Sequence, residues 1–132
     1  MPTTADGSRD VDFTRYHVDT YHAMQPLLST GKVKAIGVAN YSVAYLTALL
    51  AHPDTRVVPA VNQIENHPLL PQDDVLDFCR QNGIHVTAYS PLGSAGSPLL
   101  GLEAVKRVAE RHGVGPACVL ISWHGMSKTS SV

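Results

Sequence analysis

Three short apolar segments alternate with segments of helical periodicity along the middle of this chain. The apolar segments cover residues 32–40, residues 57–61 and the residues that begin at Ile84. Each is followed by a stretch in which apolar residues recur every three or four positions, as they do on one face of a helix. This alternation predicts a parallel sheet joined by right-handed helical crossovers, and therefore an α/β fold.

Five segments carry the helical periodicity. They cover residues 15–30, 42–51, 72–82, 100–112 and 116–123. Pro26 lies inside the first segment, and we expect a kink or a break there, because proline lacks a backbone N–H and crowds the preceding turn. Residues 1–14 are polar and predict an N-terminal loop, whereas residues 125–132 are small and polar and predict a tail without a strand.

Composition narrows the class of protein. The 132 residues suffice for one domain or part of one, and the net charge of −1 argues against nucleic acid or a membrane surface as a partner. The seven histidines and two cysteines have no spacing typical of a zinc site, so no metal is expected. Cys79 and Cys118 lie in helical patterns and are expected to be buried free thiols. Without a signal segment or a long apolar run, a cytoplasmic location is expected.

The third apolar segment leads into a loop rich in glycine and serine. Ile84, Val86 and Ala88 alternate as in a strand with one buried face, and the loop extends to Pro98 before a helical pattern resumes. Such a loop leaves the carboxyl end of its strand and can present backbone N–H groups to an anion. An ordinary strand–helix connection is the alternative interpretation.

All three predicted strands end on polar or aromatic residues: Asn40, then Asn62 and Gln63, then Tyr89 and Ser90. In a parallel sheet these ends lie at one edge, where α/β enzymes place their ligands. Amides both donate and accept hydrogen bonds, so Asn40 and Gln63 can bind a carboxamide, although capping of the next helix is equally open for Asn40. Tyr89 can stack under a flat heteroaromatic ring.

Other polar residues are weaker candidates. Glu65, Asn66 and His67 form a polar segment that can hold an acid/base pair, but asparagine and histidine before proline more commonly build a turn. Ser90 lacks the Gly-x-Ser-x-Gly turn of a nucleophilic serine. A Gly-x-Gly-x-x-Gly dinucleotide motif follows none of the strands, and no general acid has an evident partner.

Four segments give the sequence a family resemblance. They are GKVKAIGVANYS (31–42), VPAVNQIENHP (58–68), IHVTAYSPLGS (84–94) and VLISW (119–123). With these segments the chain resembles the aldo-keto reductases, fungal members most of all, from about residue 6 to residue 124. The resemblance implies an NADPH-dependent reductase of aldehydes or ketones on a (β/α)8 TIM barrel. Residues 15–124 would form part of that barrel, about three parallel strands with flanking helices.

The resemblance also implies a cofactor site. By resemblance to this family, Asn40 and Gln63 would hold the nicotinamide carboxamide, and Tyr89 would stack on the nicotinamide ring. The pyrophosphate would be lined by Ser90, Leu92 and Ser94. Ala39 stands where the family usually has a serine that contacts the carboxamide. Loss of this one neutral hydrogen bond would weaken cofactor binding by about 0.5–1.5 kcal/mol.

The resemblance assigns no catalytic residue to this chain. The family's Asp, Tyr, Lys and His tetrad has no counterpart here, and its Pro-Lys-Ser segment for the 2′-phosphate has no match in the divergent residues 125–132. The chain therefore resembles a truncated, middle-to-C-terminal part of a barrel, whose carbonyl substrate would require the missing half. The alternatives are a catalytically inactive product with at most weak cofactor binding or a partner-association role, and a small flavodoxin-like open sheet.

A barrel segment leaves sheet edges and apolar surface uncovered, because only closure removes the edges. We therefore expect the chain on its own to be marginally stable and to self-associate through its open edges. Light scattering and binding of a hydrophobic dye test this expectation, and a monodisperse monomer that binds no dye would contradict it.

Overall fold

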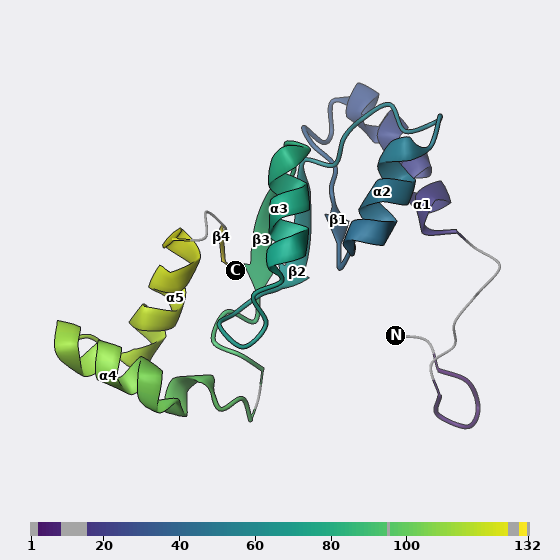
Figure 1. The fold of residues 1–132 in the computed structure, drawn as a ribbon. Helices are drawn as coiled ribbons and strands as arrows, with labels where there is room; N and C mark the ends of the chain where they lie inside the picture. Colours follow the sequence, from purple (N-terminus) through teal and green to yellow (C-terminus); the bar gives the residue numbers. More distant parts are fainter. Residues whose placement is uncertain (1–2, 9–15, 95, 127–129, 132) are drawn as a thin grey trace.

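A computed structural model describes residues 3–8, 16–94, 96–126 and 130–131 (Figure 1). The elements, in chain order, are α1 (His17–Met24), η1 (Gln25–Thr30), β1 (Val38–Ala39), α2 (Val43–Ala51), β2 (Val61–Glu65), α3 (Asp73–Gln81), β3 (His85–Tyr89), η2 (Leu99–Gly101), α4 (Glu103–His112), α5 (Pro116–Met126) and β4 (Ser130–Ser131). Helices alternate with strands through α3 and β3, so the predicted α/β class and partial barrel are confirmed.

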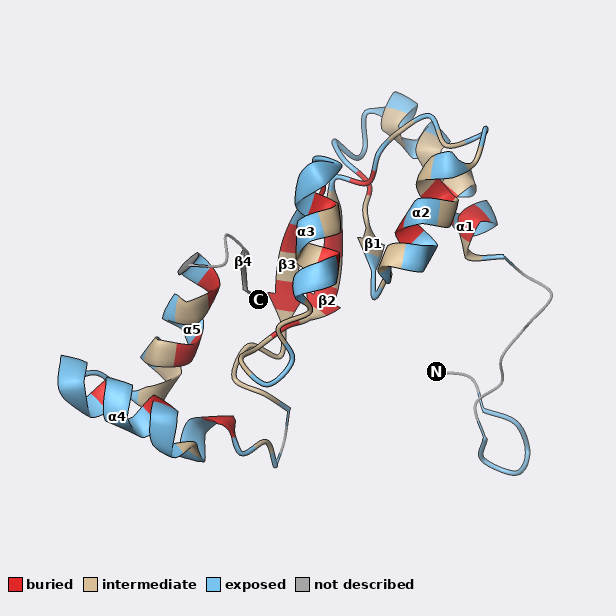
Figure 2. Ribbon diagram, in the orientation of Figure 1, coloured by how far each residue is buried: buried red, intermediate tan, exposed pale blue. Residues whose placement is uncertain are grey.

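The strands form one parallel sheet in the order β1-β2-β3-β4. Its centre is the ladder between β2 and β3, in which Asn62 pairs with Val86 and Glu65 with Tyr89. Because side chains alternate along a strand, one face of this ladder is buried and the other is partly exposed (Figure 2). Ile64 and Val86 lie on the buried face.

The largest core cluster lies between that buried face and the helices α2 and α3. Its buried members are Leu46, Ile64, Val75, Cys79, Ile84 and Val86. A second cluster joins α1 to α2, and a third joins η2 and α4 to α5. The predicted period of two in the third strand is confirmed, since its alternate residues from 84 to 88 are buried.

Local sequence signals set several helix ends. The expected interruption at Pro26 is present, because α1 gives way at Gln25 to the 3-10 helix η1. Gly31 then ends η1 with a φ of 72°, a conformation that costs glycine little. Ser42 caps α2 as expected, and its side chain accepts a hydrogen bond from the Tyr45 N–H at 3.3 Å.

The first predicted strand is much shorter than expected. Residues 32–40 were expected to be extended and covered on both faces, but β1 contains only Val38 and Ala39, and Ala39 is exposed. The physical reason is its place at the margin of the described sheet, where β2 is its only strand neighbour. Backbone bonds to β2 nevertheless continue on both sides of β1, from Ala60 to the Ile36 carbonyl and from Asn40 to the Gln63 carbonyl.

The second strand lies further along the chain than its apolar pattern indicates. The prediction of residues 57–61 is wrong, since β2 covers Val61–Glu65 and includes Asn62, Gln63 and Ile64, which were placed at a strand end and in a loop. The bounds of β2 are set by its pairing with β3, which runs from Val61 opposite His85 to Glu65 opposite Tyr89. Asn62 is tolerated in the core because its amide pairs with the backbone of Tyr41, donating to the carbonyl at 2.9 Å and accepting from the N–H at 3.3 Å.

Two further predictions are corrected near the C-terminus. The tail was expected to contain no strand, yet Ser130 and Ser131 form β4 beside β3. A ladder needs only backbone groups, so the open edge of β3 can pair with small polar residues. Cys118 is exposed rather than buried, because the buried positions of α5, Leu120 and His124, lie on another stripe. Cys79 is buried as expected, and burial raises the pKa of its thiol.

His124 is the buried histidine of α5, with 1% of its surface exposed. Burial, and to a lesser extent the nearby His67, lower the pKa of His124 from its ordinary value of 6.5. The folded protein therefore favours the neutral ring. In the described part of the chain, no helix is long and apolar enough to cross a membrane.

We predict that Gly37→Ala destabilises the fold by about 1–3 kcal/mol, the usual cost of overpacking. A methyl group at Gly37 would overlap the Val61 side chain and lie 2.7 Å from the Val61 carbonyl oxygen, at the contact between β1 and β2. Gly101→Ala is the matched control, because nothing lies within 4 Å of the added carbon. Urea unfolding gives both values, and equal midpoints for the two variants would contradict the close approach.

We predict that acidification destabilises the protein through His124. Below the unfolded-state value of about 6.5, the unfolded chain takes up a proton that the folded chain does not, so the free energy of unfolding falls as the pH is lowered. Thermal midpoints measured between about pH 7.5 and about pH 5.5 should fall more steeply for the unmodified chain than for His124→Gln. The exposed His112→Gln serves as the control, and parallel pH profiles for all three proteins would refute the prediction.

Candidate functional site

The candidate residues lie on neighbouring strands toward the carboxyl edge of the sheet, but Gln63 lies in the middle of β2 and not at its end as predicted. Asn40 follows β1 directly, and its N–H donates to the Gln63 carbonyl at 2.8 Å. Gln63 pairs with Ala39 on one side and with Thr87 on the other. Tyr89 ends β3 two residues beyond Thr87. The candidate residues are therefore staggered along the ladder rather than level with one another.

Gln63 and Tyr89 lie on the same face of the ladder. Gln63 pairs with Thr87 and Glu65 pairs with Tyr89, and alternate residues of a strand share a face. These residues are only partly buried, in contrast to Ile64, which packs with residues of α2 and α3, and to Asn62, whose amide lies beside Cys79 of α3. The face that carries Gln63 and Tyr89 is the one that the helices leave accessible.

The amides near these strand ends fall into two groups. Asn62 and Asn66 are fully buried, and both bind backbone groups of neighbouring segments. The side-chain amides of Asn40 and Gln63, by contrast, make no hydrogen bond to any other residue in the described part of the chain. Asn40 also has a φ of 59°, which bends the chain as it leaves β1. Two amides thus remain available to a ligand.

The loop after β3 is held in a tight turn. Ser90 has a φ of 52°, and the Gly93 N–H donates to the Ser90 carbonyl at 2.8 Å. Gly93 has a φ of 82°, and a side chain there would overlap Ser97. The hydroxyl oxygens of Ser90 and Ser94 lie 3.4 Å apart. The loop therefore presents two neighbouring hydroxyl groups next to Tyr89.

Leu92 and Ser94 contribute backbone N–H groups to this loop. The Leu92 side chain is partly buried and packs against the cluster of Leu99, Val105 and Leu120. Within the described ranges, the backbone N–H groups of Leu92 and Ser94 have no hydrogen-bond acceptor. Unpaired N–H groups and hydroxyls are suitable donors to an anion.

The polar segment after β2 forms a turn held by hydrogen bonds. His67 and Leu70 exchange backbone hydrogen bonds, Asn66 donates its amide to the Leu70 carbonyl, and Gln72 donates to the Glu65 carbonyl. The His67 ring lies 3.5 Å from a Glu65 carboxylate oxygen. This geometry supports the interpretation of the segment as a turn that holds β2 against α3.

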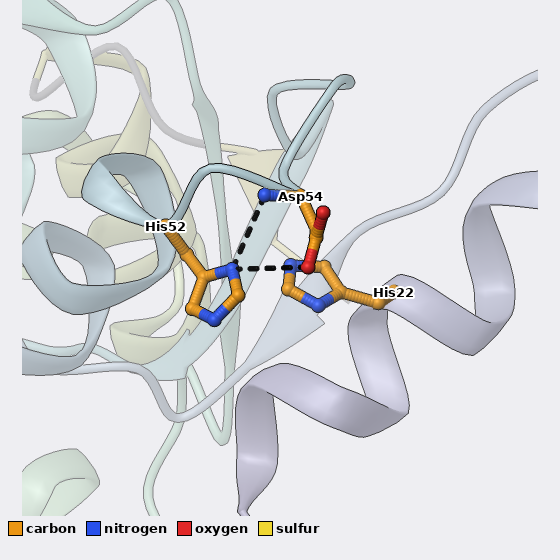
Figure 3. Close-up of side chains that lie close together, drawn as sticks. All are labelled: His22, His52 and Asp54. Atoms are coloured by element: carbon orange, nitrogen blue, oxygen red, sulfur yellow. Dashed lines mark hydrogen bonds and ion pairs between the residues drawn. The ribbon is translucent and has the colours of Figure 1, made fainter.

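The structure brings together one polar cluster that the sequence does not predict. His22, His52 and Asp54 each provide a possible ligand atom, and these atoms lie within 4.8 Å of one another (Figure 3). The cluster has no local sequence signal, because thirty residues separate the two histidines and only the packing of α1 against α2 brings them together. Histidines this far apart in the chain have none of the short spacings that are typical of a zinc site.

Known proteins share this sequence and fold. Residues 8–132 match the model of the Aldo/keto reductase family. The chain is 54% identical over 124 residues to D-galacturonate reductase of Hypocrea jecorina, covering 94% of this chain and 40% of the relative. It is 50% identical over 124 residues to aldehyde reductase YPR1 of Saccharomyces cerevisiae, covering 93% of this chain and 40% of that relative. The same yeast has a glycerol 2-dehydrogenase (NADP(+)) that is 49% identical over 94% of this chain and 40% of the relative.

The fold matches a solved structure as well. The aldose reductase of Schistosoma japonicum superimposes with a TM-score of 0.88 at 34% sequence identity, covering 99% of this chain and 41% of that protein. This chain thus spans about 40% of the length of the curated relatives named above. The family match covers more than nine-tenths of the chain and includes all of the candidate site residues. The chain belongs to the aldo/keto reductase family.

Proposed function

We propose that this chain supplies part of the nicotinamide-cofactor site of an oxidoreductase that reduces aldehydes or ketones to alcohols. Family membership supports an oxidoreductase acting on carbonyl compounds. The name of the yeast glycerol 2-dehydrogenase (NADP(+)) supports NADP(H) as the cofactor. The proposal places the protein in the cytoplasm. The carbonyl substrate and the rest of its pocket would be held by segments outside these 132 residues, because the chain spans only about 40% of its relatives.

The observation that carries this proposal is the pair of unpartnered side-chain amides of Asn40, just after β1, and Gln63, inside β2. Asn40 and Gln63 are joined by a backbone hydrogen bond, yet neither side-chain amide binds another described residue. A carboxamide offers one acceptor and two donors, which two such amides can satisfy together. In the proposal, Asn40 and Gln63 orient the nicotinamide ring through its carboxamide.

The remaining residues fit the other parts of the cofactor. The Tyr89 ring lies on the accessible face at the end of β3 and can stack on the flat nicotinamide. Ser90, Leu92 and Ser94 lie in a loop with two hydroxyls and with two N–H groups that have no acceptor among the described residues, which suits the pyrophosphate. When bound, the reduced cofactor supplies the hydride that reduces the carbonyl carbon. The residues of this chain bind and orient the cofactor.

The proposal places no catalytic residue and no metal ligand of the reduction in this chain. The Asp, Tyr, Lys and His that the family resemblance implies would act from elsewhere in the whole protein. A tyrosine hydroxyl of that set would donate the proton to the carbonyl oxygen, while the residues described above hold the opposite reactant in place. Binding of the cofactor by this chain and reduction by the whole protein are therefore separable activities.

A non-catalytic role in association is the second candidate. It is favoured by the margin of the sheet, where β1 has β2 as its only strand neighbour within the described residues and Ala39 is exposed. An uncovered edge can pair with a strand of another chain. In this alternative the chain would bind a second copy of itself and would retain at most weak cofactor binding.

We predict that Tyr89→Ala weakens NADPH binding by about 1–3 kcal/mol, roughly 5- to 150-fold, because stacking on an aromatic side chain contributes about that much per base. Titration of the chain with NADPH, followed by nicotinamide fluorescence, measures the change. Tyr45→Ala is the matched control, since Tyr45 is an exposed aromatic residue of α2 that packs near His17. Equal affinities for Tyr89→Ala and the unmodified chain would show that Tyr89 does not stack on the cofactor.

A further inference from the structure

Two histidines and an aspartate converge on the outer side of the molecule, where the ends of α1 and α2 meet. His22 lies in the last turn of α1, His52 directly follows α2, and Asp54 lies in the loop that leads to β2 (Figure 3). One ring nitrogen of each histidine and one carboxylate oxygen lie within 4.8 Å of one another. The two imidazole rings are 4.5 Å apart between their centres.

Side-chain hydrogen bonds from Gln25 and Tyr21 hold the backbone around this cluster in place. Gln25 donates its amide to the Asp54 carbonyl at 2.9 Å, and its oxygen accepts from the N–H groups of Arg56 and Val57 at 2.7 and 3.0 Å. The Tyr21 hydroxyl donates to the Val57 carbonyl at 3.0 Å, and burial raises the pKa of Tyr21 to about 12, so the donor stays protonated. The loop and α1 are thus fastened together before any ligand binds.

Hydrogen bonds also orient the two rings. Thr55 donates its hydroxyl to the Leu49 carbonyl at 2.7 Å and lies 2.9 Å from Nε2 of His22. Nδ1 of His52 accepts from the Asp54 N–H at 3.2 Å and lies 3.9 Å from an Asp54 carboxylate oxygen. The Thr55 oxygen gives its own proton to Leu49 and accepts from Nε2–H of His22, as groups that orient ligating histidines do, which leaves Nδ1 of His22 to bind a metal. The lone pair of His52 Nδ1 is held by the Asp54 N–H, so this hydrogen bond must open when His52 binds a metal through this atom.

The chemistry of these three groups is that of a site for a transition metal. Two imidazole nitrogens and one carboxylate oxygen are ligands that Zn²⁺ accepts, whereas Mg²⁺ and Ca²⁺ prefer oxygen alone. We propose that His22, His52 and Asp54 bind a divalent transition metal of the zinc type, with water completing the coordination.

The proposed site needs only a modest contraction. Ligand atoms around a tetrahedral zinc ion lie about 3.3 Å apart, so the present separations must close by about 1.5 Å at most. The His52 and Asp54 side chains are 36% and 70% exposed and can turn without disturbing the core. A surface pocket of about 480 Å³ adjoins the cluster and leaves room for water. It is lined by His22, Gln25, Pro26, Asp54, Arg56 and Val57.

The site is separate from the proposed cofactor site. The loop that contains Asp54 leads into the amino end of β2, whereas Asn40 and Tyr89 lie at the carboxyl ends of their strands. Metal bound between α1 and the loop after α2 would therefore join two segments of the fold and take no part in binding NADPH. A ligand that binds only the folded state stabilises it, so metal should also raise the unfolding midpoint.

Calorimetric titration of the metal-free full chain with Zn²⁺ tests the proposal. Saturable binding of one ion per chain is expected, together with a higher unfolding midpoint, and Mg²⁺ should produce neither effect. His52→Asn and Asp54→Asn should each weaken Zn²⁺ binding by at least about tenfold, since even the loss of a group that merely orients a ligand costs about 10- to 100-fold. The asparagine at position 52 keeps an acceptor for the Asp54 N–H, so the turn is preserved.

Matched controls separate this site from other histidines and from the cofactor site. His112→Asn removes an exposed histidine of α4 and should leave Zn²⁺ affinity unchanged. Asp54→Asn alters a largely exposed side chain, so unfolding does not explain a loss of binding, and circular dichroism confirms the fold. NADPH affinity should be the same in all of these variants. The proposal is overturned if Zn²⁺ does not bind to the folded chain, or if it binds equally well to the His52 and Asp54 variants.

Discussion

The parallel ladder between β2 and β3 is the interaction on which the rest of this structure depends. Five consecutive residue pairs form it, and the last joins Glu65 to Tyr89. Side chains alternate across a sheet, so a slip of one residue would exchange its two faces. In the observed register, Ile64 points under α2 and α3 while Gln63 points to the accessible face. The same ladder therefore builds the largest core cluster and positions the candidate cofactor residues.

Two neighbouring polar residues of this ladder differ in burial and in hydrogen bonding. Asn62 is fully buried, and both ends of its amide bind the backbone of Tyr41. Gln63 is its neighbour in sequence, but it lies on the other face and has no side-chain partner in the described part of the chain. A buried polar group is costly unless it is satisfied, so Asn62 serves the fold. An accessible amide carries no such requirement and is free to bind a ligand.

Sequence periodicity predicted those parts of the fold that depend on local chemistry. The alternation from Ile84 to Ala88, the break at Pro26 and the Ser42 cap all act through neighbouring residues, and all are present. The predictions that failed depend on distant partners. The second strand shifted because β3 sets its register, and residues 130–131 became a strand because the edge of β3 was available to them. Exposure of Cys118 likewise follows from which stripe of α5 faces α4 and η2.

The sequence by itself determined the alternating α/β order, the family and the end of the third strand at Tyr89, because these follow from periodicity and from contiguous motifs. Only the tertiary structure decided that Asn62 and Gln63 face opposite sides, and only it brought His22 to His52 and Asp54. The physical reason is that hydrophobic burial and backbone pairing join segments far apart in the chain. Side chains on those segments become neighbours without leaving a pattern in either segment alone.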